Sequence, residues 1–144
     1  MPHTAILESL LVSNHRLTRI AAQATGDTTS SAAWSTLSVL SADGPKRTGE
    51  LARTARISQP GMTKILQNLV EDEWVYRIAD VEDSRAWLIA ITEKGRAALS
   101  DWRARLAGAL SPIFSDLTPA DWATLEAASQ LLESRVGAAS VAVA

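Results

Sequence analysis

The chain has 144 residues, of which 47 % are hydrophobic and 21 % charged, and its formal net charge is −2. This balance is typical of a globular protein, and the length indicates one domain over residues 1–144. The absence of cysteine excludes disulfides, thiolate zinc sites and thiol-based redox sensing. No signal peptide is recognisable, and the longest strongly apolar run, residues 86–91, is far too short to span a bilayer. We therefore expect a cytoplasmic protein without membrane contact.

The first predicted element is a long amphipathic helix over residues 4–24, whose leucines, isoleucine and alanines recur at three- and four-residue spacing. A polar loop separates it from a second helix over residues 32–41, with Trp34, Leu37 and Leu40 on its inner face. The sequence Asp43-Gly44-Pro45 should end this second helix, because Asp-Gly favours a turn and proline cannot continue a helix.

Two short helices joined by a tight turn come next. The first is predicted over residues 48–55 with Thr48 as its N-cap, and the second begins after Ser58, because both hydroxyls can accept a free backbone N–H. Pro60 falls in the first turn of the second helix, where proline is tolerated. Its predicted buried face is made of Met62, Ile65, Leu66 and Leu69.

Residues 75–79 and 86–91 read as two strands of a hairpin, because they are rich in β-branched and aromatic residues. The order of helix, turn, helix and β-ribbon is that of a winged helix-turn-helix, whose second helix enters a DNA major groove while the ribbon reaches the neighbouring groove. The predicted fold class is therefore mainly α, with a winged helix-turn-helix over residues 32–96 and a two-stranded β-wing.

The helices outside this lobe are also apolar. Pro112 should kink or end a helix capped by Thr92, and Thr118-Pro119-Ala120-Asp121 should open a last helix that Gly137 stops. The helices at 4–24 and 93–136 surround only a small lobe, so we expect them to be dimerisation helices that bury their stripes against an identical chain. The alternative is that they fold back onto the monomer.

The positive charge is concentrated in the predicted helix-turn-helix. Residues 46–70 hold five basic residues and one acid, a net charge of +4, so the rest of the chain sums to −6. Contact with DNA phosphates needs this kind of local potential rather than a basic whole.

Residues suited to reading bases lie off the apolar stripe of the second short helix. Glutamine can pair with adenine, lysine with guanine, and threonine can meet the thymine methyl group. The residues of this polar face are Gln59, Gly61, Thr63, Lys64, Gln67 and Asn68. The alternative is that they form an ordinary solvated helix face.

At the ribbon tip, Arg85 suits insertion into a narrow minor groove. The acids Asp80, Glu82 and Asp83 would repel phosphate. They either pair with Arg85 and Arg77 to shape the tip or leave it a merely charged turn.

Several motifs together resemble the MarR family of transcriptional regulators over residues 32–98. They are Gly44-Pro45, Glu50-Leu51-Ala52, Ile57-Ser58-Gln59-Pro60, Met62-Thr63-Lys64, Leu69, Asp80-x-x-Asp83-x-Arg85, Leu88 and Ile91-Thr92-Glu93-x-Gly95. The resemblance implies a helical dimer with a winged DNA-binding lobe that represses a nearby gene and releases DNA on binding a small aromatic or phenolic effector. By position, residues 58–64 would begin the recognition helix and Arg85 would be the wing arginine.

The predicted function is thus a sequence-specific, ligand-responsive repressor that binds palindromic double-stranded DNA as a homodimer. The alternative is a winged-helix protein-interaction module without specific DNA binding. The predicted DNA-binding residues are Arg47, Thr48, Ser58, Gln59, Gly61, Met62, Thr63, Lys64, Asn68 and Arg85.

Three positions depart from the family pattern. Trp74 stands where the family usually has glycine. Tryptophan would strain a backbone that needs a positive φ, so we expect the turn to be reshaped. Ser84 replaces a common basic residue beside Arg85, so the wing should grip phosphate less strongly. Arg47 replaces a frequent threonine cap, so the helix should start one residue later, at Thr48.

An effector pocket between the dimer helices and the DNA lobe is predicted to be lined by Asn14, His15, Arg19 and Trp34. The alternative is that Trp34 belongs to the core and His15 to the surface. No catalytic motif is present, and with two histidines and no cysteine we predict neither an enzyme nor a metal site or cofactor.

Overall fold

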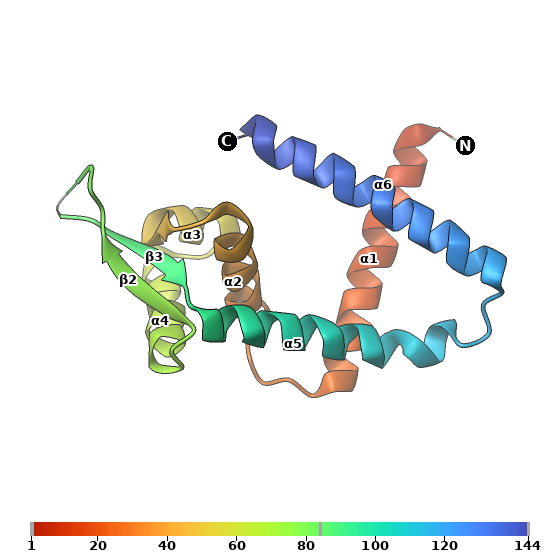
Figure 1. Cartoon of the computed structure of the whole chain (residues 1–144), viewed down its shortest axis with the longest axis horizontal. Coiled ribbons are helices and arrows are strands. Elements are labelled where there is room, and N and C mark those ends of the chain that lie inside the picture. Colours follow the sequence, from red (N-terminus) through yellow and green to blue (C-terminus); the bar gives the residue numbers. More distant parts are fainter. Residues whose placement is uncertain (1, 84, 144) are drawn as a thin grey trace. The chain divides into compact units, whose positions relative to one another are not determined.

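The computed structural model describes residues 2–83 and 85–143 (Figure 1). The elements in chain order are α1 (His3–Thr25), α2 (Ser31–Asp43), β1 (Lys46–Arg47), α3 (Thr48–Ala55), α4 (Gln59–Glu71), β2 (Val75–Ala79), β3 (Trp87–Ile91), α5 (Glu93–Leu110), the short 3₁₀ helix η1 (Ser111–Phe114) and α6 (Pro119–Val143). The fold is mainly α with a winged helix-turn-helix, as predicted. The expectation about Ser84 lies outside the described residues.

The chain divides into two compact units, Met1–Ala109 and Leu110–Ala144. The core of the first unit forms where α2, α3 and α4 pack against the sheet and the start of α5. Its buried side chains include Leu37, Leu40, Leu51, Met62, Leu66, Leu69, Val75, Ile89, Ile91 and Leu99. In the second unit, none of the side chains described over residues 110–139 is buried. No helix in the described part of the chain is both long and apolar enough to cross a membrane.

The sheet has three antiparallel strands in the order β1-β3-β2, one more than predicted. Lys46 pairs with Ile89 and Arg47 with Leu88, which joins the segment before α3 to the wing. The prediction missed β1 because two polar residues carry no alternation that would mark a strand. The wing itself is the β2–β3 ribbon, which extends beyond the helices of the lobe (Figure 1).

The predicted helix starts at Ser58, Thr92 and Thr118 are confirmed. Ser58 Oγ accepts from Gly61 N at 3.1 Å, and Thr92 Oγ1 accepts from Gly95 N at 2.9 Å. Thr118 Oγ1 accepts from Asp121 N at 3.1 Å while Asp121 Oδ2 accepts from Thr118 N at 3.0 Å. These side chains satisfy N–H groups that have no partner inside the helix.

The predicted range of α3, residues 48–55, is confirmed, but two other predictions about helix ends are wrong. Thr48 is the first helical residue rather than the N-cap; Arg47 holds the N-cap position, and its backbone N–H donates to Glu50 Oε1 at 3.2 Å. Gly137 does not stop α6, which continues to Val143. A single glycine inside a helix costs only about 1 kcal/mol, so the helix-forming neighbours prevail.

Trp74 carries no positive-φ strain, because the residue with a positive φ in this turn is the preceding Glu73, at 62°. The Trp74 ring instead stacks on Trp34, with ring centroids 5.3 Å apart, and Trp34 stacks on Trp102 at 4.7 Å. The Trp34 indole N–H also donates to Asp27 Oδ2 at 2.7 Å. This stack joins α2, the turn between α4 and β2, and α5.

The same turn explains Gly95. The carbonyl oxygen of Trp74 accepts from Thr92 N at 2.9 Å, and α5 begins directly against that carbonyl. A Cβ added at Gly95 would lie 2.2 Å from this oxygen and 2.9 Å from Ile91 Cγ1. Only glycine therefore lets α5 start this close to the turn.

We predict that Gly95→Ala destabilises the fold by about 3 kcal/mol or more, because the clash is with backbone rather than with a movable side chain. Gly108→Ala is the matched control in the same helix, since a Cβ there meets nothing within 4 Å. That change should stabilise the protein by about 0.5–1 kcal/mol. Urea unfolding followed by circular dichroism measures both, and equal effects of the two substitutions would contradict the packing described.

Candidate nucleic-acid interface

The polar face predicted on the recognition helix lies on the surface. α4 buries Leu66 and Leu69 and leaves Gln59, Lys64 and Asn68 exposed. Thr63 and Gln67 are exposed as well, while Gly61 is half-buried beneath the Ser58 cap. The helix therefore presents a continuous row of hydrogen-bonding side chains to solvent.

Met62 is the exception among the predicted DNA-binding residues. Its side chain is 0 % exposed and packs in the core beside Thr36, whose hydroxyl lies 3.8 Å from the sulfur. Including Met62 among the DNA-binding residues was wrong. The side chain lies on the buried face of the helix and cannot reach a ligand in solvent.

An ion pair connects the start of α3 to the base of the wing. Arg47 Nε donates to Asp80 Oδ2 at 2.9 Å, and Arg47 Nη2 donates to the same oxygen. The other carboxylate oxygen of Asp80 accepts from Glu82 N at 2.9 Å. Asp80 is only 7 % exposed, and the hydrogen bonds from Glu82 N–H and the Arg47 guanidinium lower its pKa. The predicted partners Arg77 and Arg85 were wrong for Asp80, because β1 brings Arg47 beside it.

The wing tip is shaped by backbone hydrogen bonds. Asp83 Oδ1 accepts from Arg85 N at 3.0 Å, and the carbonyl of Asp83 accepts from Ala86 N at 3.0 Å. These contacts are typical of aspartate in tight turns. Among the described residues the Arg85 guanidinium has no ion-pair partner, so its charge stays available at the exposed tip.

Two shallow clefts flank Arg47 between α3 and the wing, with volumes of about 560 and 400 Å³. They share Arg47, Glu50 and Arg53. The larger is further lined by Asp80, Val81, Glu82 and Leu88, and the smaller by Thr48, Gly49, Gln59, Ala86 and Trp87. We call the smaller one the wing groove, because the first residue of the recognition helix and the wing border the same space there.

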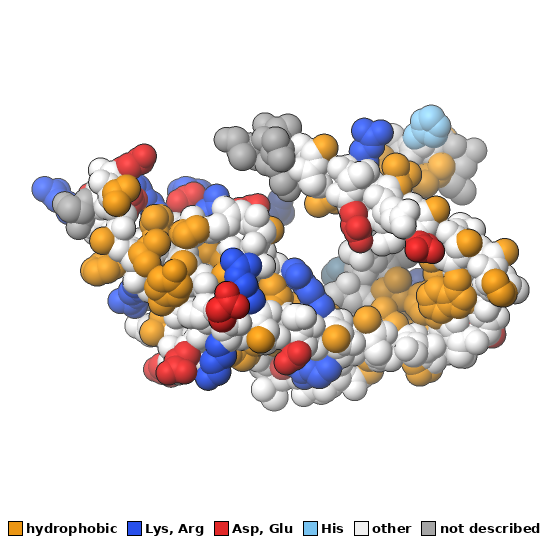
Figure 2. Space-filling view, in the orientation of Figure 1, with side chains coloured by type: hydrophobic (Ala, Val, Ile, Leu, Met, Phe, Trp, Pro, Cys, Tyr) orange, Lys and Arg blue, Asp and Glu red, His pale blue; other side chains and the backbone are white. Residues whose placement is uncertain are grey.

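The ion pair changes which charges the interface offers. Asp80 offsets the charge of Arg47, although Arg47 remains 43 % exposed. Lys46, Arg53, Arg56 and Lys64 form no ion pair within the described part of the chain. In Figure 2 basic side chains lie at the tip of the wing and over neighbouring helices, with hydrophobic side chains gathered on the ribbon between them.

The predicted effector residues are not brought together. Asn14, His15 and Arg19 are exposed along α1 and line none of the clefts described above. Trp34 is 3 % exposed and enclosed by its stack, so predicting it to line an effector pocket was wrong.

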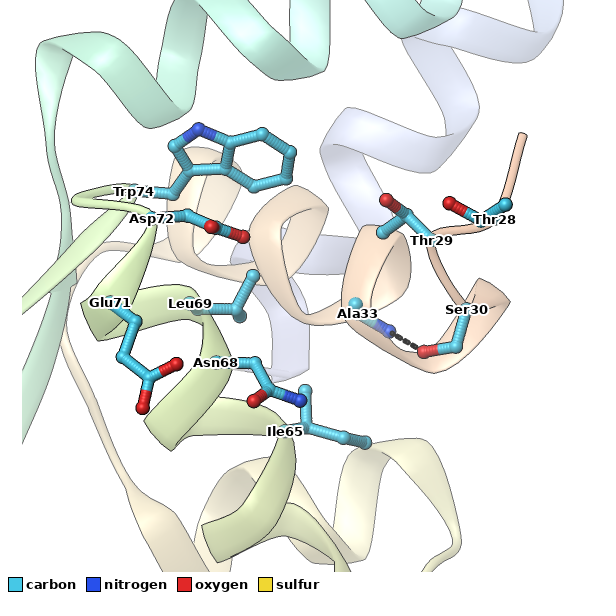
Figure 3. A pocket seen from close by; sticks show the side chains of 10 residues that line it. All are labelled: Thr28, Thr29, Ser30, Ala33, Ile65, Asn68, Leu69, Glu71, Asp72 and Trp74. Carbon is cyan, nitrogen blue, oxygen red and sulfur yellow. Dashed lines mark hydrogen bonds between the residues drawn. The ribbon is translucent and has the colours of Figure 1, made fainter.

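A further cleft of about 390 Å³ lies between the loop before α2 and the second half of α4 (Figure 3). Trp74 and Leu69 lie on one side and Ala33 on the other, and the carboxylate of Asp72 points between them. Sequence reasoning missed this cleft because its walls are far apart along the chain. Within the described residues no group of three or more histidine, aspartate or glutamate side chains is arranged to hold a metal ion.

The sequence of this chain is similar to sequences of known transcriptional regulators. Residues 27–86, from the loop before α2 through the wing tip, match the model of the MarR family. The chain is 36 % identical over 89 residues to the uncharacterised HTH-type transcriptional regulator YpoP of Bacillus subtilis, covering 62 % of this chain. The match spans 63 % of that relative's length.

Solved structures share the fold. The transcriptional regulator Tm0710 from Thermotoga maritima has a TM-score of 0.74 at 22 % identity, over 91 % of this chain and 93 % of its own. The apo form of wild-type MarR from E. coli has a TM-score of 0.62 at 20 % identity, over 92 % and 97 %.

We predict that Asp80→Asn lowers the urea midpoint of unfolding at neutral pH, because it removes the carboxylate that holds Arg47. A carboxyl with a lowered folded-state pKa stabilises the fold while ionised, and this contribution is lost as pH falls through that pKa, below 3.8. The difference between the variant and the parent protein should therefore shrink in acid.

Asp116→Asn is the control, since it removes an exposed carboxylate that forms no ion pair within the described residues. In a double-mutant cycle, Arg47→Gln should add little to Asp80→Asn. Additive effects of the two substitutions would show that the ion pair contributes nothing to stability.

Proposed function

We propose that this chain, which belongs to the MarR family of transcriptional regulators, binds double-stranded DNA sequence-specifically and represses the gene beside its operator. The observation that carries the proposal is the exposed polar face of α4 together with an exposed arginine at the tip of the wing. The proposed role is one of binding rather than catalysis, and it implies that the protein acts in the cytoplasm, where its DNA is.

In the proposed complex α4 enters the major groove. Gln59, Thr63, Lys64 and Asn68 can then meet base edges, because all four lie on the exposed side of the helix. Arg85 at the wing tip reaches the adjacent minor groove, where narrow A·T stretches concentrate negative potential.

The residues around α3 are suited to phosphate rather than bases. Arg53 is exposed, Thr48 lies at the N-terminal end of α3, and both line the wing groove. The positive end of a helix dipole and a guanidinium both favour a phosphate there. Ser58 stays part of the proposed interface through its hydroxyl proton, since its oxygen already caps α4. Arg47 acts mainly by holding the wing.

The active form in this proposal is a homodimer. α1 and α6 each expose a row of large apolar side chains that the described chain leaves uncovered, which is unusual for a monomer. An identical copy is the simplest partner, and its two-fold symmetry matches a palindromic operator with half-sites about 10 base pairs apart. On α1 the exposed residues include Ile6, Leu7, Leu10 and Leu11, and on α6 they include Trp122, Leu125, Leu131, Leu132 and Val136.

A small aromatic or phenolic effector completes the proposal. Asn14, His15 and Arg19 are exposed on a helix that would lie at the dimer interface, where they could hold a carboxylate or phenolate. An effector bound there would release DNA by favouring dimers whose two recognition helices no longer fit the half-site spacing.

The alternative is a winged-helix module that binds another protein. Such a module needs no basic recognition face, whereas this one keeps Lys46, Arg53, Arg56, Lys64 and Arg85 outside ion pairs among the described residues. DNA binding accounts for those charges, and protein binding does not require them.

Titration with duplex DNA from the region upstream of its own gene tests the proposal. We expect a dimer to bind with an affinity that falls steeply with salt, because binding releases counterions from phosphates. Footprinting should show two protected half-sites about 10 base pairs apart. Equal affinity for unrelated duplexes, or no binding that salt weakens, would refute a sequence-specific regulator.

We predict that Lys64→Ala weakens operator binding about tenfold or more, the effect of losing one good base or phosphate contact. If Lys64 touches a base, the variant also discriminates less between operator and mutated sites. An equal loss on all sequences, with a shallower salt dependence, would assign Lys64 to a phosphate. Lys94→Ala, which removes an exposed lysine beside Glu73, should leave binding unchanged.

A further inference from the structure

Trp87 is an exposed aromatic residue on the face of the wing that is turned toward the helices. Side chains alternate between the two faces of a strand, so Trp87 shares a face with Ile89 and Ile91. Those two side chains are buried against the helices. Trp87 lies two residues before Ile89, nearer the wing tip, and is 57 % exposed. Its cross-strand partner, Ala79, is too small to cover it.

The surroundings of Trp87 are polar and charged. The indole borders the wing groove, together with Gln59 at the start of the recognition helix and Thr48, Glu50 and Arg53 from α3. The groove has a volume of about 400 Å³. A large apolar surface left open beside a guanidinium suits a ligand with both an apolar face and a negative charge.

We propose that Trp87 packs against a deoxyribose of the DNA strand that crosses the wing groove. The inference rests on the proposed DNA binding and names a contact within it. With α4 in the major groove and the wing in the adjacent minor groove, the sugar–phosphate strand between those grooves must pass between the two elements. That strand carries the required chemistry, because its sugars present apolar C–H groups and its phosphates are anionic.

In this complex the basic and aromatic residues of the groove have different partners on the DNA strand. Arg53 and the start of α3 hold phosphates, and Trp87 covers the sugar between them. The indole N–H adds one hydrogen-bond donor. A sugar contact carries no charge of its own, so it should contribute affinity without contributing to the salt dependence.

The wing supplies a matched control. Tyr76 is an aromatic residue of similar exposure, 48 %, and its cross-strand partner is Ala90. Ala90 neighbours Ile89 and Ile91 along β3, so Tyr76 projects from the opposite face of the ribbon to Trp87. Loss of Tyr76 removes a comparable aromatic surface from the same two strands without touching the wing groove.

The test compares operator affinity at several salt concentrations for Trp87→Ala, Trp87→Phe, Tyr76→Ala and Arg53→Ala. We expect Trp87→Ala to weaken binding about tenfold with an unchanged salt slope, and Trp87→Phe to retain most of the affinity. Arg53→Ala should reduce the slope by about one, as expected for one lost phosphate contact. Tyr76→Ala should bind like the parent protein, and thermal unfolding checks that each variant is folded.

Tryptophan fluorescence reports the contact directly. DNA should shield part of the emission from acrylamide, a neutral quencher, and this protection should disappear in Trp87→Phe while DNA still binds. Such protection could not arise from a purely structural role of the indole.

If the parent protein binds DNA but Trp87→Ala binds equally well, or Tyr76→Ala loses as much, the Trp87 contact is refuted and the proposed regulator stands. A changed salt slope in Trp87→Ala would likewise replace the sugar contact with an electrostatic one. If the parent protein shows no salt-dependent DNA binding, the proposed function fails and the Trp87 contact fails with it. Trp87 would then be exposed for a protein partner.

Discussion

The stacking of Trp34 between Trp74 and Trp102 organises the winged helix-turn-helix lobe. The three indoles come from α2, from the turn between α4 and β2, and from α5, with ring centroids 5.3 and 4.7 Å apart. Asp27 accepts the Trp34 indole N–H, so the stack is hydrogen-bonded as well as packed. Because the Trp74 carbonyl also accepts from Thr92 N, one residue sets where the wing begins and where α5 starts after it. The recognition helix and the wing are thereby built on a common rigid base.

The Arg47–Asp80 ion pair connects the wing to β1, the strand at the other edge of the sheet. It joins β1 and the start of α3 to the wing base, while the tip is shaped separately by Asp83. A buried carboxylate without its cation would be costly, so the main role of Arg47 in this structure is to hold the base of the wing. The wing contains several acidic residues, but its surface is not uniformly negative, because the buried Asp80 is neutralised by Arg47.

Much of the fold and part of the candidate site could be predicted from the sequence. The predictions that were wrong have physical reasons. Ser58, Thr92 and Thr118 cap helices through contacts three residues away, and such local chemistry is visible in the chain itself. The Arg47–Asp80 pair joins residues 33 positions apart through a two-residue strand, and no periodicity marks so short an element. Trp34 could equally have lined a pocket or filled the core, and only the positions of Trp74 and Trp102 decide that. Met62 was misassigned because a motif that begins the recognition helix includes buried as well as exposed positions.

The exposed Trp87 follows from the same construction. The sheet face that includes Ile89 and Ile91 is covered by helices near the base of the ribbon. The ribbon extends beyond those helices, so the same face is uncovered at Trp87. The groove beside it is bordered by Gln59 from the recognition helix and Arg53 from α3, which are the groups that a DNA strand between two grooves would meet. The surface that the fold leaves uncovered on the wing is thus the surface that the proposed DNA complex would cover, and the core of the lobe continues into its interface.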